Sequence, residues 1–184
     1  MTIKDSIVDL LKEKTAAVQE VCAEIAKLED QKKNGHLDAG YIAKVIDPQI
    51  SELRLKRHNR KDEAEVALHK LAEEHRQAVL NSNRIKGEEL TDDARLFTCG
   101  VQLKPEEIEA IMDRSAGNHT MLQLAQRYAQ EHDIKINRVY DSGKAAEISS
   151  TNDLESAGKL YLDHWIDQSN AGDMLSKFFG GEAQ

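Results

Sequence analysis

The chain of 184 residues is long enough for one large domain or two small ones, because a typical domain contains roughly 100–150 residues. Aromatic residues make up 4% of the sequence and charged residues 32%, a balance that suits amphipathic helices better than a sheet core. The formal net charge of −8 disfavours a protein whose main task is to cover a nucleic-acid backbone. No window approaches the roughly 18 apolar residues of a transmembrane helix, so we expect no membrane contact.

The N-terminal sequence and the two cysteines predict a cytoplasmic, unprocessed protein. Residues 1–6 lead into charged amphipathic sequence without the apolar core of a secretory signal. Cys22 and Cys99 have neither the spacing of a disulfide framework nor that of a metal site, which fits a reducing compartment. We interpret Cys99 as a structural cysteine.

A heptad pattern begins near the N-terminus. Apolar residues recur at alternating steps of four and three over about three and a half repeats, with Lys14 at the one missing place. These seam residues are Ile7, Leu11, Val18, Val21, Ile25 and Leu28. The positions between them are charged, so the predicted helix has one apolar stripe that needs a partner.

The first helix is expected to end at Asn34-Gly35, because two lysines precede this point and complement the negative end of the helix dipole. An apolar-rich helical turn is expected at residues 40–46. Asp47-Pro48 then has the pattern of an N-cap followed by proline at the first helical position. We therefore expect a short connection between two long helices.

The second helix is expected to run unbroken from Pro48 to about Leu80, with Leu68 and Leu71 among its seam residues. Two helices with matching seams can close as an antiparallel coiled-coil hairpin, either within one chain or between two chains. Such a rod is too thin to hold a large core. We therefore expect a homo-oligomer, with a dimer as the default.

A basic segment interrupts this acidic sequence in the middle of the second helix. Residues 54–61 contain five formal positive charges and no acid. The charged residues are Arg54, Lys56, Arg57, Arg60 and Lys61. The segment is either a solvated face or the tip of the hairpin, or else a docking surface for an acidic partner or nucleic acid.

The helical period lapses between residues 81 and 103, so we place a domain boundary between residues 83 and 84. The periodic pattern resumes at Pro105, at Asn118 and at Leu154. The sequence thus predicts an all-α protein in which a long N-terminal hairpin, residues 1–83, is followed by a small helical domain, residues 84–184.

A short apolar segment near the C-terminus lies between glycines. Its apolar residues are Met174, Leu175, Phe178 and Phe179. They form either a peptide that docks in the groove of a partner or part of the protein's own core, since a domain with so few aromatic residues needs both phenylalanines. The sequence leaves the two alternatives open.

The sequence contains no phosphate-binding loop, dinucleotide fingerprint, nucleophile elbow or zinc signature. Glu65, His69 and Glu73 share one helix face and could present a metal, although an ordinary surface network accounts for them equally well. His119 and His132 lie near predicted helix ends, where a cap or a dipole-stabilised imidazole is the simpler interpretation. We therefore predict a protein that is not an enzyme and uses no cofactor or metal.

Four segments follow the coiled coil in a characteristic order. They are Tyr-Ile-Ala-Lys-Val-Ile-Asp-Pro-Gln-Ile-Ser-Glu-Leu at residues 41–53, Leu-Thr-Asp-Asp-Ala-Arg-Leu-Phe at 90–97, Leu-Lys-Pro-Glu-Glu-Ile at 103–108 and Asn-His-Thr-Met-Leu-Gln-Leu-Ala-Gln-Arg-Tyr-Ala at 118–129. In this order they resemble small structural or assembly proteins encoded in the head-gene modules of tailed phages and prophages of Gram-positive bacteria. The resemblance covers residues 40–132 and includes no catalytic motif.

The resemblance implies a scaffold-like or virion-associated role in the host cytoplasm, in which a helical rod self-associates and one end contacts a capsid or other virion protein. A second hypothesis is a cytoplasmic adaptor or regulator that binds a partner protein through the basic segment or the C-terminal tail. Capsid and portal genes beside the coding gene would favour the first hypothesis.

Overall fold

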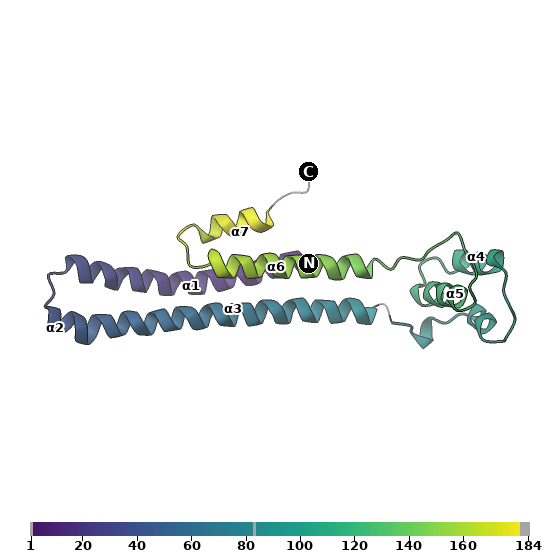
Figure 1. The fold of residues 1–184 in the computed structure, drawn as a ribbon, viewed down its shortest axis with the longest axis horizontal. Coiled ribbons are helices and arrows are strands. Elements are labelled where there is room, and N and C mark those ends of the chain that lie inside the picture. The colour runs from purple at the N-terminus through teal and green to yellow at the C-terminus, as the bar shows by residue number, and fades with distance from the viewer. Residues whose placement is uncertain (1, 83, 181–184) are drawn as a thin grey trace. The chain divides into compact units, whose positions relative to one another are not determined.

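The computed structural model describes residues 2–82 and 84–180, and within these residues it contains helices and no strand (Figure 1). The chain divides into two compact units, one formed by residues 1–75 together with 150–184 and the other by residues 76–149. The predicted all-α class and the antiparallel pairing of two long N-terminal helices are confirmed.

The first long helix, α1 (Ile3–Asn34), begins with a capping box. The Thr2 hydroxyl accepts a hydrogen bond from the Asp5 N–H at 3.2 Å, and the Asp5 carboxylate accepts one from the Thr2 N–H at 2.8 Å. These contacts satisfy two backbone donors that have no partner inside the helix. The helix ends at Asn34, as predicted, and the Gly35 N–H closes its last turn on the Gln31 carbonyl.

The hairpin turns through a short helix, α2 (Ala39–Tyr41), that is capped by Asp38. The Asp38 carboxylate accepts hydrogen bonds from the N–H groups of Gly40 and Tyr41, at 2.8 and 3.2 Å. Asp38 therefore has the N-cap role that the sequence analysis gave to Asp47.

A π-helical turn, η1 (Ile42–Ile46), leads without a break into the second long helix, α3 (Asp47–Ser82). Asp47 has helical backbone angles and its N–H bonds to the carbonyl of Ile42, five residues earlier, so its predicted role as an N-cap is wrong. Pro48 has no N–H to donate to the preceding turn, and a wider turn lets the helix continue past the missing bond.

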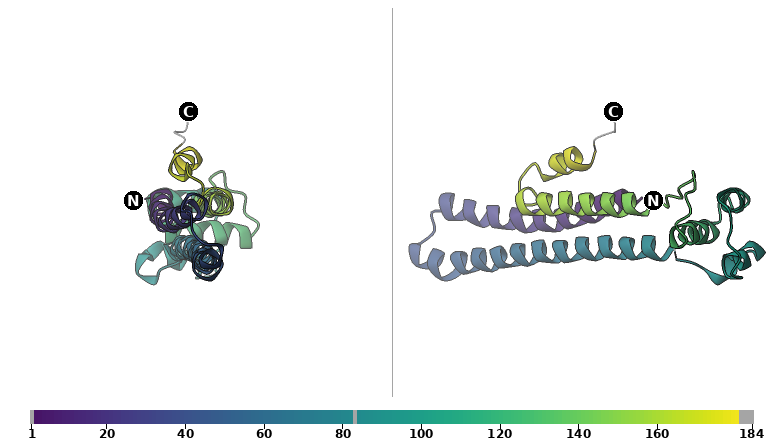
Figure 2. Two further views of the ribbon diagram at one scale, coloured as in Figure 1. Left: turned by 90° about the vertical axis from the view of Figure 1, so that its left-hand side faces the viewer. Right: turned by 45° about the vertical axis from the view of Figure 1, so that its right-hand side comes forward.

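Two later helices, α6 (Lys144–His164) and α7 (Ala171–Phe179), pack on the hairpin. Seen end-on, α1, α3 and α6 form a three-sided bundle, and α7 lies against the side formed by α1 and α6 (Figure 2, left). All four helices contribute to its core: Ile7, Leu11 and Val18 of α1, Ala64 and Leu68 of α3, Tyr161 and Leu162 of α6 with Ile166 just after its end, and Ala171, Leu175 and Phe179 of α7.

This arrangement differs from the predicted boundary between residues 83 and 84. Residues 150–184 belong to the same unit as the hairpin, and the last long helix begins at Lys144 instead of near Leu154. An apolar stripe in a sequence shows that a helix face will be covered, but its period does not identify the helix that covers it.

The close packing of α6 on α3 depends on a glycine. A Cβ atom added at Gly158 would lie 2.7 Å from Cδ2 of Leu68, so the small residue permits this approach. On the α1 side, the Tyr161 hydroxyl lies 2.7 Å from the Thr15 hydroxyl, and burial raises the pKa of Tyr161 despite this hydrogen bond. The bundle therefore buries a hydrogen-bonded hydroxyl pair between α1 and α6.

The second unit contains two 3₁₀ helices, η2 (Gly87–Glu89) and η3 (Asp92–Phe97), and two α-helices, α4 (Pro105–Arg114) and α5 (His119–Glu131). Its buried core consists of Leu103, Ile108, Ile111, Met112, Met121, Ala125, Tyr128 and Ala129. The Tyr128 hydroxyl donates to the Val101 carbonyl at 2.9 Å and accepts from the Leu103 N–H at 3.2 Å, which fastens the segment before α4 to α5.

A polar cluster joins η2 to the start of α5 in the same unit. The Glu89 carboxylate accepts hydrogen bonds from the Thr120 hydroxyl at 2.7 Å and from Lys86 at 3.1 Å. The Thr120 bond and the Lys86 bond lower the pKa of Glu89. The cluster is structural, because Glu89, Thr120 and Lys86 bind one another within this unit.

Candidate protein-interaction site on the hairpin

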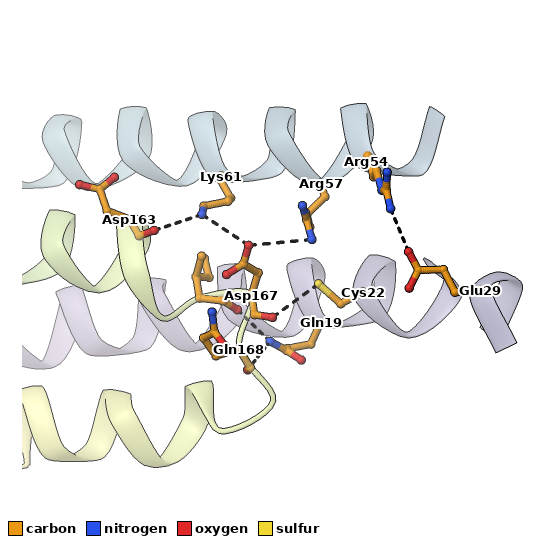
Figure 3. A network of polar contacts seen from close by, with 10 residues as sticks. Gln19, Cys22, Glu29, Arg54, Arg57, Lys61, Asp163, Asp167 and Gln168 are labelled. Atoms are coloured by element: carbon orange, nitrogen blue, oxygen red, sulfur yellow. Dashed lines mark hydrogen bonds and ion pairs between the residues drawn. The ribbon is translucent and has the colours of Figure 1, made fainter. Parts of the chain in front are cut away.

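The connection between α6 and α7 is fastened to the middle of the hairpin by polar contacts (Figure 3). On the α1 side, the Gln19 amide nitrogen donates to the carbonyl oxygens of Ile166 at 2.8 Å and of Gln168 at 2.9 Å. Both carbonyl groups belong to the connection that follows α6, and the Gln168 carbonyl also accepts a hydrogen bond from the Ala171 N–H at 3.0 Å. Gln19 therefore fastens this connection onto α1.

On the α3 side, Lys61 and Arg57 hold the same connection through Asp167. The Lys61 ammonium lies 3.6 Å from the Asp167 carboxylate and donates to the Asp163 carbonyl at 3.4 Å, and Arg57 lies 4.0 Å from the same carboxylate. Cations near the C-terminal end of a helix also interact favourably with its dipole. The three-helix part of the bundle thus ends at the level of these residues.

Beyond this level the hairpin continues toward its tip as a pair of helices (Figure 1). Four isoleucine and valine side chains, Val21, Ile25, Ile46 and Ile50, are buried between α1 and α3. Leu28 and Leu53 pack against them but remain half-buried, because two helices cannot enclose a side chain from all directions.

A groove of about 860 Å³ runs along this part of the hairpin, and we call it the distal groove. It is lined from α1 by Glu24, Lys27, Leu28 and Gln31, and from α3 by Gln49, Glu52, Leu53, Leu55, Lys56, Asn59, Arg60 and Glu63. On α1, Cys22 contacts the α6–α7 connection, whereas Glu24 lines the groove. Two residues correspond to about 200° around a helix, so the groove and α6 lie on opposite faces of the hairpin.

The rim of the distal groove is charged but balanced, with three acids and three bases. Within the described part of the chain, the side chains of Glu24, Lys27, Glu52 and Lys56 form no ion pair or hydrogen bond with another residue. The groove is therefore an apolar floor between two charged walls, and four of the six charged side chains on these walls lack a partner within the described residues.

The predicted seam residues lie mostly in the interior of one chain. Ile7, Leu11, Val18, Val21, Ile25 and Leu68 are buried, while Leu28 and Leu71 are half-buried. Helices of the same chain cover this seam, since α6 and α7 complete the core that the hairpin begins. Only Leu28 of the predicted seam also lines the distal groove.

The basic segment is largely neutralised by acids, of which Glu29 and Asp167 are distant in sequence. Arg54 pairs with Glu29 at 2.9 Å, Lys61 and Arg57 face Asp167, and Arg60 lies 3.5 Å from Glu63. The segment lies in the middle of α3 and the hairpin tip is at residues 35–41, so the tip is excluded among the alternatives for this segment. Lys56 and Arg60 are the members of the segment that line the groove.

The apolar C-terminal segment forms α7 and packs on its own bundle. Leu175 and Phe179 are buried in the core, and Met174 and Phe178 are half-buried against it. The Phe178 ring meets the Tyr161 ring edge-on, with centroids 6.3 Å apart. Use of these residues as a docking peptide would first require α7 to leave the bundle.

The residues considered for other chemistry are engaged in structural contacts. His69 pairs with Glu155 of α6 at 2.9 Å, and within the described residues no group of three or more His, Cys, Asp or Glu is placed to hold a metal. His119 hydrogen-bonds to Tyr140, and the His132 ring stacks at 4.3 Å on Tyr128. Each side chain is thus accounted for by a neighbour in the fold.

The sequence analysis missed the groove residues Glu24, Gln31 and Gln49. Polar side chains beside a heptad seam resemble an ordinary solvated surface, and the sequence does not show which face of the hairpin α6 and α7 leave uncovered. Asp167 was also missed, because its role depends on a contact with residues more than a hundred positions away. The one sign in the sequence of an acidic partner such as Asp167 was that residues 54–61 contain five lysine and arginine residues and no acidic one.

No family model matches the chain, and neither a curated protein nor a solved structure matches it. Across the described residues, no helix is both long and apolar enough to cross a membrane. We therefore infer function from the geometry of the hairpin and from the resemblance of the sequence motifs to phage head-module proteins.

Proposed function

We propose that this chain is a non-catalytic structural or assembly protein that acts through self-association and contacts with other proteins. The main support is the distal groove, where Leu28 and Leu53 lie half-buried between charged walls. A helical surface that leaves apolar side chains uncovered commonly buries them against a further helix. The hairpin thus has a place for a partner that the described residues of its own chain do not fill.

The resemblance to phage head-module proteins gives the more specific form of the proposal, a scaffold-like or virion-associated role. The resembling segment at residues 41–53 forms the end of α2, the π turn and the start of α3. It supplies Gln49, Glu52 and Leu53 to the distal groove. The motif that suggests an assembly protein therefore builds the surface at which assembly contacts are proposed.

The test begins with the genes beside the coding gene. A neighbouring capsid gene is co-expressed with the full chain or alone, and assembled particles are counted by electron microscopy and sized by sedimentation. The proposal expects the chain to change the yield or the size of the particles. The absence of capsid and portal genes, or particles identical with and without the chain, would contradict the virion role.

A cytoplasmic adaptor is the second candidate, favoured by the burial of the predicted seam within one chain. A hairpin whose seam is covered by α6 does not need a second copy for stability. The adaptor would use the distal groove and the basic residues on its rim, Lys56 and Arg60, to bind a helix of another protein. Neighbouring genes unrelated to virion proteins, with a chain that stays monomeric, would favour it.

A further inference from the structure

We infer that the distal groove binds the distal groove of a second copy of this chain, with the two hairpins parallel and related by a two-fold axis along the helices. The inference deepens the proposed function and rests on it for the groove being an interaction surface. In this arrangement the α1 wall of each copy faces the α3 wall of the other, which gives a four-helix contact.

The register of α1 against α3 sets which residues would meet. The Lys32–Asp47 ion pair, at 2.6 Å, joins the two helices near the tip. Lys27 lies five residues before Lys32 and Glu52 five residues after Asp47, so these two side chains are level along the antiparallel hairpin. Continuing one turn further brings Glu24 level with residues 55–56, which include Lys56.

Residues at the same height along the hairpin carry opposite charges on the two walls of the groove. Glu24 is level with Lys56, and Lys27 is level with Glu52. A parallel two-fold contact places the α1 residue of one copy opposite the α3 residue of the other. Each pair then occurs twice, giving four ion pairs from side chains that have no such partner within the described part of one chain.

The floor and the far end of the groove fit the same arrangement. Leu28 and Leu53 are close to level and would bury their exposed sides against the same leucines of the second copy. Gln31 and Gln49 are also close to level, and side-chain amides can donate and accept hydrogen bonds with one another. A two-fold contact requires a patch that is complementary to itself, and these pairs satisfy that requirement.

Charge also favours a second copy at this surface. The chain has a formal net charge of −8, so two copies repel each other over most of their surfaces. The rim of the groove has three acids and three bases and is therefore neutral. Two acidic chains can meet here without bringing like charges together. The face is also clear of α6 and α7, which pack on the opposite side of the hairpin.

Exposed ion pairs are individually weak, so the expected dimer is a moderate one that charge reversal weakens without unfolding the chain. Glu24→Lys places two lysines opposite each other twice per dimer, and Lys56→Glu does the same with two glutamates. We expect either change to raise the dimer dissociation constant about ten- to thirty-fold. In a dimer that contains one copy of each variant, all of these pairs join opposite charges. A mixture of the two variants should therefore associate as tightly as the wild-type chain.

Glu65→Lys is the matched control, because it makes the same charge change at an exposed α3 position outside the groove. Lowering the net negative charge of the chain by itself favours association. A dimer that is weakened by Glu24→Lys but not by Glu65→Lys therefore identifies the groove as the interface. Both groove positions are exposed, and circular dichroism should show unchanged helicity and melting.

The decisive experiment measures association by sedimentation equilibrium and contact by zero-length cross-linking of carboxylates to amines in an equal mixture of isotope-labelled and unlabelled full chains. The expected result is a dimer with mixed-isotope Glu24–Lys56 and Lys27–Glu52 links, weakened by either reversal and restored by mixing. A monomer at all concentrations, or mixed-isotope links that join other surfaces, would overturn the inference. If the chain is a monomer that still alters capsid assembly, the inference of a groove dimer is overturned but the proposed function is not. If a groove dimer forms but has no effect on capsid assembly, only the virion role is contradicted.

Discussion

Replacement of Gly158 by alanine tests the packing of α6 on the hairpin. An alanine in place of an interior glycine normally stabilises a helix by about 1 kcal/mol. Here the new Cβ would lie 2.7 Å from Cδ2 and 3.2 Å from Cδ1 of Leu68, a side chain that is 0% exposed and must shift within the core. Overpacking of this kind costs about 1–3 kcal/mol. We therefore expect Gly158→Ala to lower the free energy of unfolding by about 1 kcal/mol.

The assay is urea denaturation followed by the fluorescence of Trp165, the single tryptophan, which packs against the core of the bundle. Gly172→Ala is the control, since nothing lies within 4 Å of the added Cβ in α7 and no loss of stability is expected. Addition of Leu68→Ala should make the two changes less costly together than their sum, because the smaller residue removes the overlap. A Gly158→Ala protein that is more stable by about 1 kcal/mol would refute the packing of α6 on α3.

Three further predictions concern polar contacts. Gln19→Ala removes two hydrogen bonds to carbonyl groups, so we expect faster amide hydrogen exchange at residues 165–180 and a loss of about 1–2 kcal/mol; unchanged exchange would contradict the role of Gln19. Burial raises the pKa of Tyr161, so the unfolded chain ionises first, and stability present below pH 10 should fall as the pH rises beyond it; Tyr161→Phe should make that fall less steep, and an equal slope would contradict burial. The Thr120 hydrogen bond lowers the pKa of Glu89, so its contribution to stability is present above the ordinary pKa and is lost as the pH falls through the lowered one; in an NMR titration, Thr120→Val should move this pKa up toward 4.5, and no movement would contradict the assignment.

Local signals in the sequence were sufficient for the two long helices. The heptad spacing of Ile7 to Leu28 and the glycine after Asn34 predicted the extent of α1, because capping and periodicity involve residues close to one another in the chain. The same reasoning misplaced the cap of the second helix, since a π turn carries the helix through Pro48 and no sequence pattern indicated it.

Long-range packing accounts for the rest of the difference. The seam was expected to drive association between chains, yet α6 brings Tyr161 and Ile166 from far along the sequence to cover it. The first residues of α6 are polar and weakly periodic, so its start at Lys144 was not predictable from amphipathicity. The distal groove could not be predicted either, because the sequence pattern does not show which face of the hairpin the later helices leave uncovered.

Self-association of this chain through the distal groove is tested most directly by its mass in solution. Light scattering coupled to size-exclusion chromatography, over a concentration series that brackets the micromolar range, gives the mass of the full chain and of its Glu24→Lys and Glu65→Lys variants. For the wild type and for Glu65→Lys, we expect the mass to rise from the 20.7 kDa of one chain toward twice that value. For Glu24→Lys, we expect this rise in mass only at higher concentration. A wild-type mass that stays at one chain throughout the series, or the same rise in all three proteins, would contradict self-association through the groove.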